Sequence, residues 1–159
     1  MLSLRLLGHW GRWRSSRSPR SGPAAGAFSH SFSLRHLDGG SCNACELELH
    51  ALSAPQYDSA RFGIDFVASP RHADALMLTG GVTRNLAEAV RMTVEATPRP
   101  RLVIACGDCA CGRGPFSGSY AVLDSPTDAV AVDVEIPGCP PSPQHILDAL
   151  CKAADGSDR

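Results

Sequence analysis

The chain has 159 residues, a mass of 16.8 kDa and a formal net charge of −1 at pH 7, with 43% hydrophobic and 19% charged residues. This length and hydrophobic content favour one globular domain with a tail, and the near-zero charge argues against a chain dedicated to nucleic-acid binding. No apolar run reaches the roughly 18–20 residues that span a bilayer, so we expect no transmembrane helix.

Residues 1–30 differ in composition from the rest of the chain. Arginine is frequent there, the first acidic residue is Asp38, and residues 15–30 are rich in Ser, Pro, Gly and Ala. This composition predicts a basic arm that is either disordered or, because leucine and tryptophan recur near helical spacing before residue 15, a short helix on a membrane or partner surface. It is also typical of a mitochondrial transit peptide, whereas a secretory signal would need a continuous apolar segment.

From residue 31 onward, segments typical of strands alternate with segments typical of helices. The predicted strands are 31–37, 62–69, 73–80, 101–107 and 129–138, and the predicted helices are 44–54, 84–96 and 142–153. Ser142 and Pro143 suit the N-cap and first position of the last helix. Because strands and helices alternate, we expect an α/β domain over residues 31–153 with a parallel sheet, helices on its faces and a tail at 154–159.

Seven cysteines are the most informative feature of the composition. They are Cys42, Cys45, Cys106, Cys109, Cys111, Cys139 and Cys151. The odd number and the CxxC spacings fit metal or cluster ligation better than a disulfide framework. Thiols follow the predicted strands 31–37, 101–107 and 129–138. Because open α/β sheets build their sites at the carboxyl ends of the strands, we expect these thiols to gather there.

Two kinds of metal site are compatible with these cysteines. Iron–sulfur clusters take thiolates from several segments, and a [4Fe–4S] cluster normally takes four. The alternative is a structural zinc site on the two CxxC pairs, but 60 residues lie between Cys45 and Cys106, against about 15–20 in zinc ribbons, and zinc leaves Cys139 unexplained. A third interpretation, a buried small hydrophobic residue, suits Cys151.

Four stretches of the sequence resemble one protein family. They are HLDGGSCNACELEL (36–49), YDSARFGIDFVASPRHADALMLTGGVT (57–83), VIACGDCACGRGPFSGSY (103–120) and VDVEIPGCPPSP (132–143). Together they resemble the family of the 20 kDa subunit of respiratory complex I, which includes the small subunits of membrane-bound [NiFe]-hydrogenases. Complex I members carry adjacent cysteines at the first position, whereas this chain has Cys42-Asn-Ala-Cys45. The resemblance therefore points to the small subunit of energy-converting, formate hydrogenlyase-type hydrogenases.

The resemblance implies a fold and a set of ligands. The implied fold is a flavodoxin-like three-layer α/β domain with a mostly parallel sheet of about four strands. The implied ligands of one [4Fe–4S] cluster are Cys42, Cys45, Cys109 and Cys139. Cys106 and Cys111 stand where the family usually has other residues and remain alternates to Cys109. Glu46 and Glu48 suit the start of a helix, and Glu48 matches a family acid, which makes it either a proton relay or a solvated helix-start acid.

The resemblance also implies a function. The chain would be an electron-transfer subunit of a [NiFe]-hydrogenase-type oxidoreductase complex, without a complete active site of its own. Its implied partners are a large subunit, a ferredoxin-like iron–sulfur subunit and a membrane arm, and its implied place is the cytoplasmic face of the cell membrane, or the matrix side if residues 1–30 are a transit peptide. The alternatives are the equivalent subunit of a complex I-like NADH/quinone oxidoreductase and a zinc-stabilised, non-catalytic α/β scaffold.

A subunit that passes electrons onward must dock its cluster edge against a partner. We therefore expect exposed apolar surface on the loops 38–45, 80–83 and 116–120. His72 is either a group whose charge responds to the redox state of the cluster or a plain surface histidine.

Overall fold

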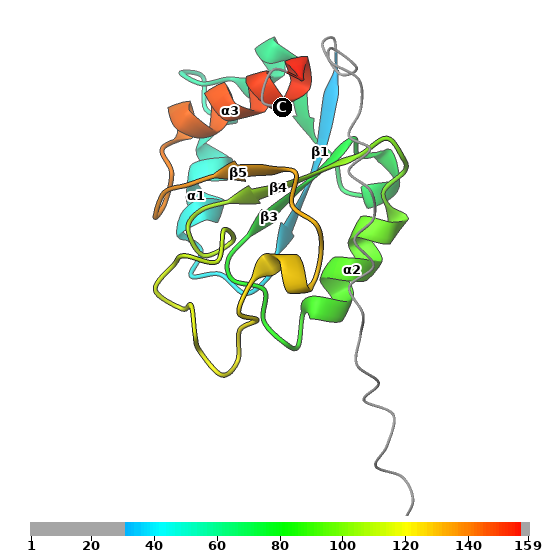
Figure 1. The fold of residues 1–159 in the computed structure, drawn as a ribbon. Coiled ribbons are helices and arrows are strands. Elements are labelled where there is room, and N and C mark those ends of the chain that lie inside the picture. Colours follow the sequence, from blue (N-terminus) through cyan, green and yellow to red (C-terminus); the bar gives the residue numbers. More distant parts are fainter. Residues whose placement is uncertain (1–30, 157–159) are drawn as a thin grey trace, which may run out of the picture.

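The computed structural model describes residues 31–156, so the arm predicted over residues 1–30 lies outside the described residues. The helices and strands are β1 (Phe32–Asp38), α1 (Ala44–Ala51), β2 (Ile64–Phe66), β3 (Ala75–Thr79), α2 (Ala87–Ala96), β4 (Leu102–Cys106), β5 (Val134–Ile136) and α3 (Pro143–Asp155). Three short 3-10 helices lie at Ser59–Phe62, Pro70–His72 and Pro126–Asp128. The alternation of strands and helices predicted from the sequence is therefore confirmed (Figure 1).

The five strands of the described domain form one sheet in the order β2-β1-β3-β4-β5, and every neighbouring pair is parallel. Flavodoxin-like doubly wound sheets share this strand order. The sheet is parallel throughout rather than mostly parallel, and it has one strand more than the expected four, because the short segments β2 and β5 both pair at its edges.

Apolar side chains cover both faces of the sheet. Met77 and Ile104 pack on one face with residues of α1 and α3, whereas Leu78 and Val103 pack on the other face with Val90 of α2. Every position of β3 and β4 is buried, as expected for parallel strands that helices cover on both sides. Figure 1 shows α1 and α3 on one side of the sheet and α2 on the other, which gives three layers.

Two strands are shorter than their sequence patterns predict. β2 begins only at Ile64, because Ser59–Phe62 forms a 3-10 helix that Gly63 ends with a φ of 74°. β5 begins only at Val134, because Ala129 and Val130 follow another 3-10 helix and pack into the apolar cluster around α2.

The last helix is longer than predicted. The hydroxyl of Ser142 accepts a hydrogen bond from the His145 N–H at 3.3 Å, which confirms the predicted N-cap. The helix continues to Asp155, two residues past the predicted end of the domain, and Gly156 ends it with a φ of 72°. Burial of Ala153 and Ala154 against the sheet explains the extension.

We expect the packing of α3 to stabilise the domain strongly. Leu150 is fully buried in the larger apolar cluster, so Leu150→Ala should lower the free energy of unfolding by about 2–5 kcal/mol. Met92 on α2 is 61% exposed, so Met92→Ala should change the free energy of unfolding by less than about 0.5 kcal/mol. Urea unfolding of the full chain measures both values, and equal losses would show that α3 does not cover the core.

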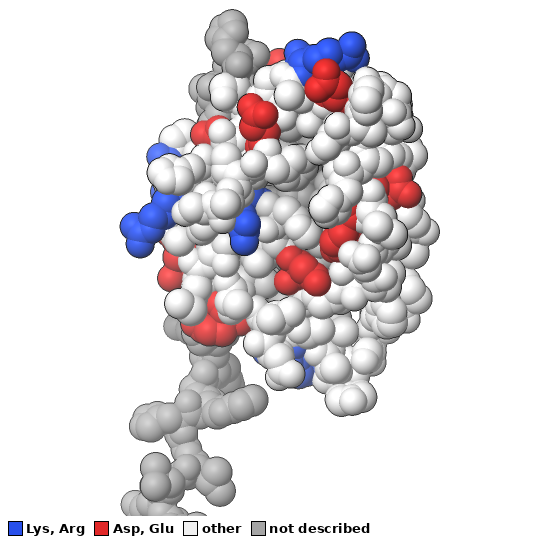
Figure 2. All heavy atoms as spheres, turned by 180° about the vertical axis from the view of Figure 1, so that it is seen from behind, with Lys and Arg blue, Asp and Glu red and all other residues white. Residues whose placement is uncertain are grey.

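On the face turned away in Figure 1, acidic and basic side chains are interspersed on a largely uncharged surface (Figure 2). Of the helices in residues 31–156, none is both long enough and apolar enough to cross a membrane.

Candidate metal centre

Four strands of the sheet end in one row of register partners. Asp38, Thr79, Cys106 and Ile136 are the last residues of β1, β3, β4 and β5, and each pairs with the next across the sheet. Because the strands are parallel, the four segments that follow leave the sheet at the same edge (Figure 1). Three of those segments carry the candidate thiols, so the prediction that cysteines follow strands at one edge is confirmed.

Main-chain hydrogen bonds continue the pairing beyond the strands. The Gly39 N–H donates to the Thr79 carbonyl at 2.9 Å, which fastens the segment after β1 to β3. The Gly107 N–H donates to the Ile136 carbonyl at 2.8 Å, which fastens the segment after β4 to β5. The segments with the thiols are therefore extensions of the sheet and not free loops.

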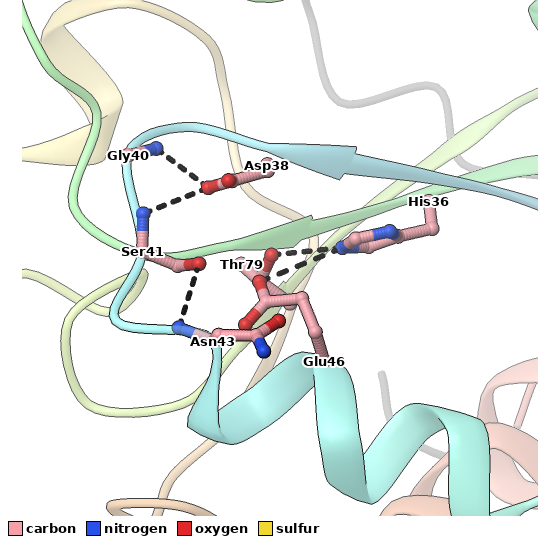
Figure 3. Close-up of polar contacts among 7 residues, drawn as sticks. All are labelled: His36, Asp38, Gly40, Ser41, Asn43, Glu46 and Thr79. Atoms are coloured by element: carbon pink, nitrogen blue, oxygen red, sulfur yellow. Dashed lines mark hydrogen bonds and ion pairs between the residues drawn. The ribbon is translucent and has the colours of Figure 1, made fainter.

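The turn after β1 is shaped by its own polar side chains. The Asp38 Oδ1 accepts hydrogen bonds from the N–H groups of Gly40 and Ser41 at 2.7 and 2.8 Å, and the Ser41 Oγ accepts one from the Asn43 N–H at 3.2 Å (Figure 3). This turn places Cys42 immediately before α1, at an exposed position.

The structure brings the four predicted cysteines into one neighbourhood. Cys42 and Cys139 are exposed, and Cys45 and Cys109 are half-buried. Burial, then Glu46, then the other three thiols raise the pKa of Cys45 to about 11. Burial, then Cys139 and Cys42, also raise the pKa of Cys109. Each of these two thiols is therefore within electrostatic range of the others, while the role of the four as ligands stays a prediction.

The four thiols do not surround a single point. Within residues 31–156, no three His, Cys, Asp or Glu side chains are arranged to hold one metal ion. In a [4Fe–4S] cluster each of the four thiolates binds a different iron of the cube, so cluster ligands surround a volume.

The backbone beside the thiols has no room for additional side chains. A Cβ on Gly107, whose φ is +93°, would lie 2.5 Å from the Cys45 Sγ. A Cβ on Gly80, whose φ is +71°, would lie 2.7 Å from the main chain of Ser41, next to Cys42. Soft thiolate donors with glycine backbone close to them form a donor set suited to iron–sulfur chemistry. The residues present therefore fit a [4Fe–4S] group.

The remaining cysteines face the apolar interior. Cys106 is fully buried in the larger apolar cluster, where burial, followed by the Cys45 thiol, raises its pKa. Cys111 is 8% exposed, its Sγ donates to the Ala105 carbonyl at 3.8 Å, and burial raises its pKa to about 11. Cys151 is half-buried on α3 and packs against the larger cluster. These positions favour Cys109 over Cys106 and Cys111 as the ligand from this segment.

A buried carboxylate lies next to the site, at a position where the sequence pattern predicts only an acid that suits the start of a helix. Glu46 is in the first turn of α1, as expected, but it is 8% exposed and its Oε1 lies 3.7 Å from the His36 Nε2. His36 also shares a hydrogen bond of 2.8 Å with Thr79, and burial lowers the pKa of the imidazole despite the opposing effect of Glu46 (Figure 3). The spacing of Glu46 and Leu49 on one helix face was the signal for this burial.

Two other titratable candidates differ in position. Glu48 is half-buried on α1, three residues after Cys45, and its role as a proton relay stays a prediction. His72 is exposed on the 3-10 helix that precedes β3, so it lies at the amino end of that strand and away from the thiols. This position favours a plain surface histidine over a group whose charge responds to the redox state of the cluster.

The segments expected to form a docking surface differ in exposure. In the predicted segment 116–120, Phe116 and Tyr120 are 45% and 91% exposed. The predicted segment 38–45 has no large apolar side chain, and Leu47 on α1, which is 62% exposed, lies two residues past it. The expectation is wrong for Gly80–Val82, which is buried because the Val82 carbonyl accepts a hydrogen bond from the Leu123 N–H at 2.8 Å and the later loop covers it. Exposed apolar surface near the thiols therefore comes from α1 and the segment 116–120.

Comparison with known proteins agrees with this arrangement. Residues 42–153 match the family described as NADH ubiquinone oxidoreductase, 20 kDa subunit. The chain is 45% identical over 121 residues to "Probable membrane-bound hydrogenase subunit mbhJ" of Pyrococcus furiosus, covering 76% of this chain and 72% of that protein. It is 44% identical over 111 residues to formate hydrogenlyase subunit 7 of Escherichia coli, covering 70% of this chain and 44% of that protein.

A solved structure from an archaeal complex resembles the chain in both fold and sequence. It is a chain of the membrane-bound sulfane sulfur reductase, an archaeal respiratory membrane complex, with a TM-score of 0.68 and 30% sequence identity. The match covers 83% of this chain and 75% of that chain.

Proposed function

The chain belongs to the family of the 20 kDa subunit of NADH:ubiquinone oxidoreductase and the [NiFe]-hydrogenase small subunit, and on that premise we propose that it carries one [4Fe–4S] cluster and transfers electrons within a membrane-bound hydrogenase-type complex. As a member of this family, the chain is a subunit of a hydrogenase or NADH-quinone oxidoreductase complex. The proposed ligands are Cys42, Cys45, Cys109 and Cys139.

One observation carries the proposal. Thiols from three segments that are far apart in the sequence follow the carboxyl ends of neighbouring parallel strands and so lie at one edge of the sheet. A chain that needed cysteine only for packing would bury all of its thiols, as this one buries Cys106 and Cys111. Exposure of Cys42 and Cys139 supports ligation instead.

Each part of the site has its own task in this proposal. A bound cluster would accept and release one electron at a time. The turn that Asp38 shapes presents Cys42, the first turn of α1 presents Cys45, and Gly107 leaves space beside the Cys45 sulfur. Exposed Leu47, on α1, offers apolar surface through which a large partner subunit would approach.

The spacing of the first cysteine pair supports a hydrogenase-type complex over a quinone-reducing one. This chain has two residues between Cys42 and Cys45, and the two relatives compared above carry the names of a hydrogenase subunit and of a formate hydrogenlyase subunit. The proposed partners are accordingly a large hydrogenase-like subunit, a ferredoxin-like subunit and a membrane arm, with this chain peripheral on the cytoplasmic face. The equivalent subunit of a complex I-like enzyme is the second candidate, because the matching family is named for that enzyme.

Metal and sulfide analysis tests the proposal. The full chain, purified without oxygen, should contain about four iron atoms and about four acid-labile sulfides, and little zinc. Stoichiometric zinc without sulfide would contradict the proposal and support a zinc-stabilised scaffold. In the complex purified through this chain, dye reduction by hydrogen rather than by NADH would distinguish the hydrogenase-type partner from the quinone-reducing one.

A further inference from the structure

Within residues 31–156, the same pair of hydrogen bonds occurs at three places on the sheet, and each time an aspartate forms both bonds. The Asp74 N–H donates to the Ser33 carbonyl at 2.8 Å, and its Oδ2 accepts from the Ser33 N–H at 2.9 Å. Asp133 is bonded in the same way to Val103, at 2.8 and 2.9 Å. Both aspartates lie at the amino edge of the sheet, immediately before β3 or β5.

The third aspartate of this kind is Asp108, and it lies at the opposite edge. Its N–H donates to the Gly138 carbonyl at 2.8 Å, and its Oδ1 accepts from the Gly138 N–H at 2.8 Å. Asp108 directly precedes Cys109, and Gly138 directly precedes Cys139. This pair of bonds therefore joins the segments of two proposed ligands at the positions next to them.

We propose that Asp108 is a positioning residue of the metal centre, whose carboxylate holds the Cys109 and Cys139 segments at a fixed separation. The inference rests on the proposed function, because it assigns a task toward the group that these two cysteines would hold. Asp108 does not itself contact that group in this proposal. It acts through the main chain of Gly138.

The surroundings of Asp108 show why its side chain matters for the register. β4 and β5 pair only over the last three residues of each strand, so few ladder bonds fix the segments beyond them. The Asp108 carbonyl accepts a hydrogen bond from the Arg113 N–H at 2.8 Å, and the Arg113 guanidinium pairs with Glu135 of β5 at 3.0 Å. The turn that contains Cys109 is thus bonded to β5 and the segment after it at both of its ends, through Asp108 and through Arg113. The bond from the Asp108 carboxylate to Gly138 is the one next to Cys139.

The competing explanation is that Asp108 only strengthens the pairing of β4 and β5. Asp133 gives a matched control, because it joins the same two strands with the same pair of bonds at the edge without thiols. A purely structural role predicts equal consequences for the two aspartates. A positioning role predicts that only Asp108 affects what the thiols hold.

Four variants of the full chain test the proposal through release of iron to a chelator. Asp108→Ala and Asp108→Glu should release iron about 10- to 100-fold faster than the parent, because loss of a residue that orients metal ligands typically weakens metal affinity by that factor. Asp108→Asn keeps an oxygen that can accept from Gly138, so its release rate should stay near that of the parent. Asp133→Ala should release iron at the parent rate even where it lowers thermal stability as much as Asp108→Ala does.

Each outcome decides between the explanations. Equal rates of iron release from Asp108→Ala and Asp133→Ala would overturn the proposal. Fast release from Asp108→Asn together with slow release from Asp108→Glu would also overturn it, because that result would show that the negative charge of residue 108 matters and the position of its oxygen does not. If Asp108→Ala fails to fold, the Asn and Glu variants carry the comparison alone. Cys139→Ser separates the two levels of the argument, because retention of iron in that variant contradicts the ligand set itself, whatever the Asp108 variants do.

Discussion

Cys139→Ser should remove most of the iron from the full chain, whereas Cys151→Ser should leave its iron content unchanged. Cys139 is exposed immediately after β5, at the sheet edge where the other proposed ligands lie. A serine hydroxyl is a harder and less acidic ligand than a thiol, so it replaces a cluster thiolate poorly. Cys151 is half-buried on α3 and packs against the apolar cluster, so its loss affects packing alone.

Iron and acid-labile sulfide per chain, measured after anaerobic purification, give the readout. Cys111→Ser is a second control, because this thiol is buried and bonded to the Ala105 carbonyl. Iron retained in Cys139→Ser but lost in Cys111→Ser would show that the segment 106–111 supplies a different ligand and that Cys139 supplies none.

The order of strands and helices could be predicted because each of these elements has a local sequence pattern that is typical of it. β3 and β4 are short, almost wholly apolar segments, which is typical of strands covered on both faces, and α3 has its N-cap Ser142 and Pro143 in the sequence. The extents of β2 and β5 could not be predicted in this way. An apolar residue such as Val130 can be buried in the core from a loop as well as from a strand. Only its packing against α2 in the folded chain shows which of these two structures it adopts.

The gathering of the thiols could be predicted from chain order alone. Parallel strands bring their carboxyl ends to one edge, so it sufficed to see that cysteines follow three predicted strands. The spacing of Glu46 and Leu49 indicated that Glu46 is buried, but the hydrogen-bond and ion-pair partners of Asp108 and Glu46 could not be found from pattern. The bond from Asp108 to Gly138 spans 30 residues, and the contact of Glu46 with His36 depends on how α1 lies against β1. Such contacts arise from tertiary packing and leave only weak signals in the sequence.

The register of the sheet explains how a site can form from short strands. β5 pairs with β4 over three residues, yet it aligns Ile136 with Cys106 and so places Gly138 beside Asp108. A shift of one residue in this pairing would turn the segment after β5 away from Cys109. The position of Cys139 thus depends on a small number of hydrogen bonds, which is why single substitutions of the residues that form them should have large effects on metal content.

Gly107→Ala should abolish iron binding and destabilise the domain more than a matched glycine substitution. Gly107 has a φ of +93°, and a Cβ there would lie 2.5 Å from the Cys45 Sγ. The methyl group would have to displace this sulfur, because Gly107 is held to β5 by the hydrogen bond to the Ile136 carbonyl at 2.8 Å. The left-handed backbone alone costs an alanine about 1–2 kcal/mol, and the displaced sulfur adds to that cost.

Gly118→Ala separates these two effects. Gly118 has a φ of +77° and nothing within 4 Å of its added Cβ, so alanine there meets the backbone cost without the overlap. Gly118→Ala should therefore keep its iron and lose about 1–2 kcal/mol in the free energy of unfolding. Gly107→Ala should lose more, together with its iron. The Cys45 sulfur is displaced only in Gly107→Ala. A parent-like iron content in that variant would therefore mean that Cys45 is not a ligand of the metal centre.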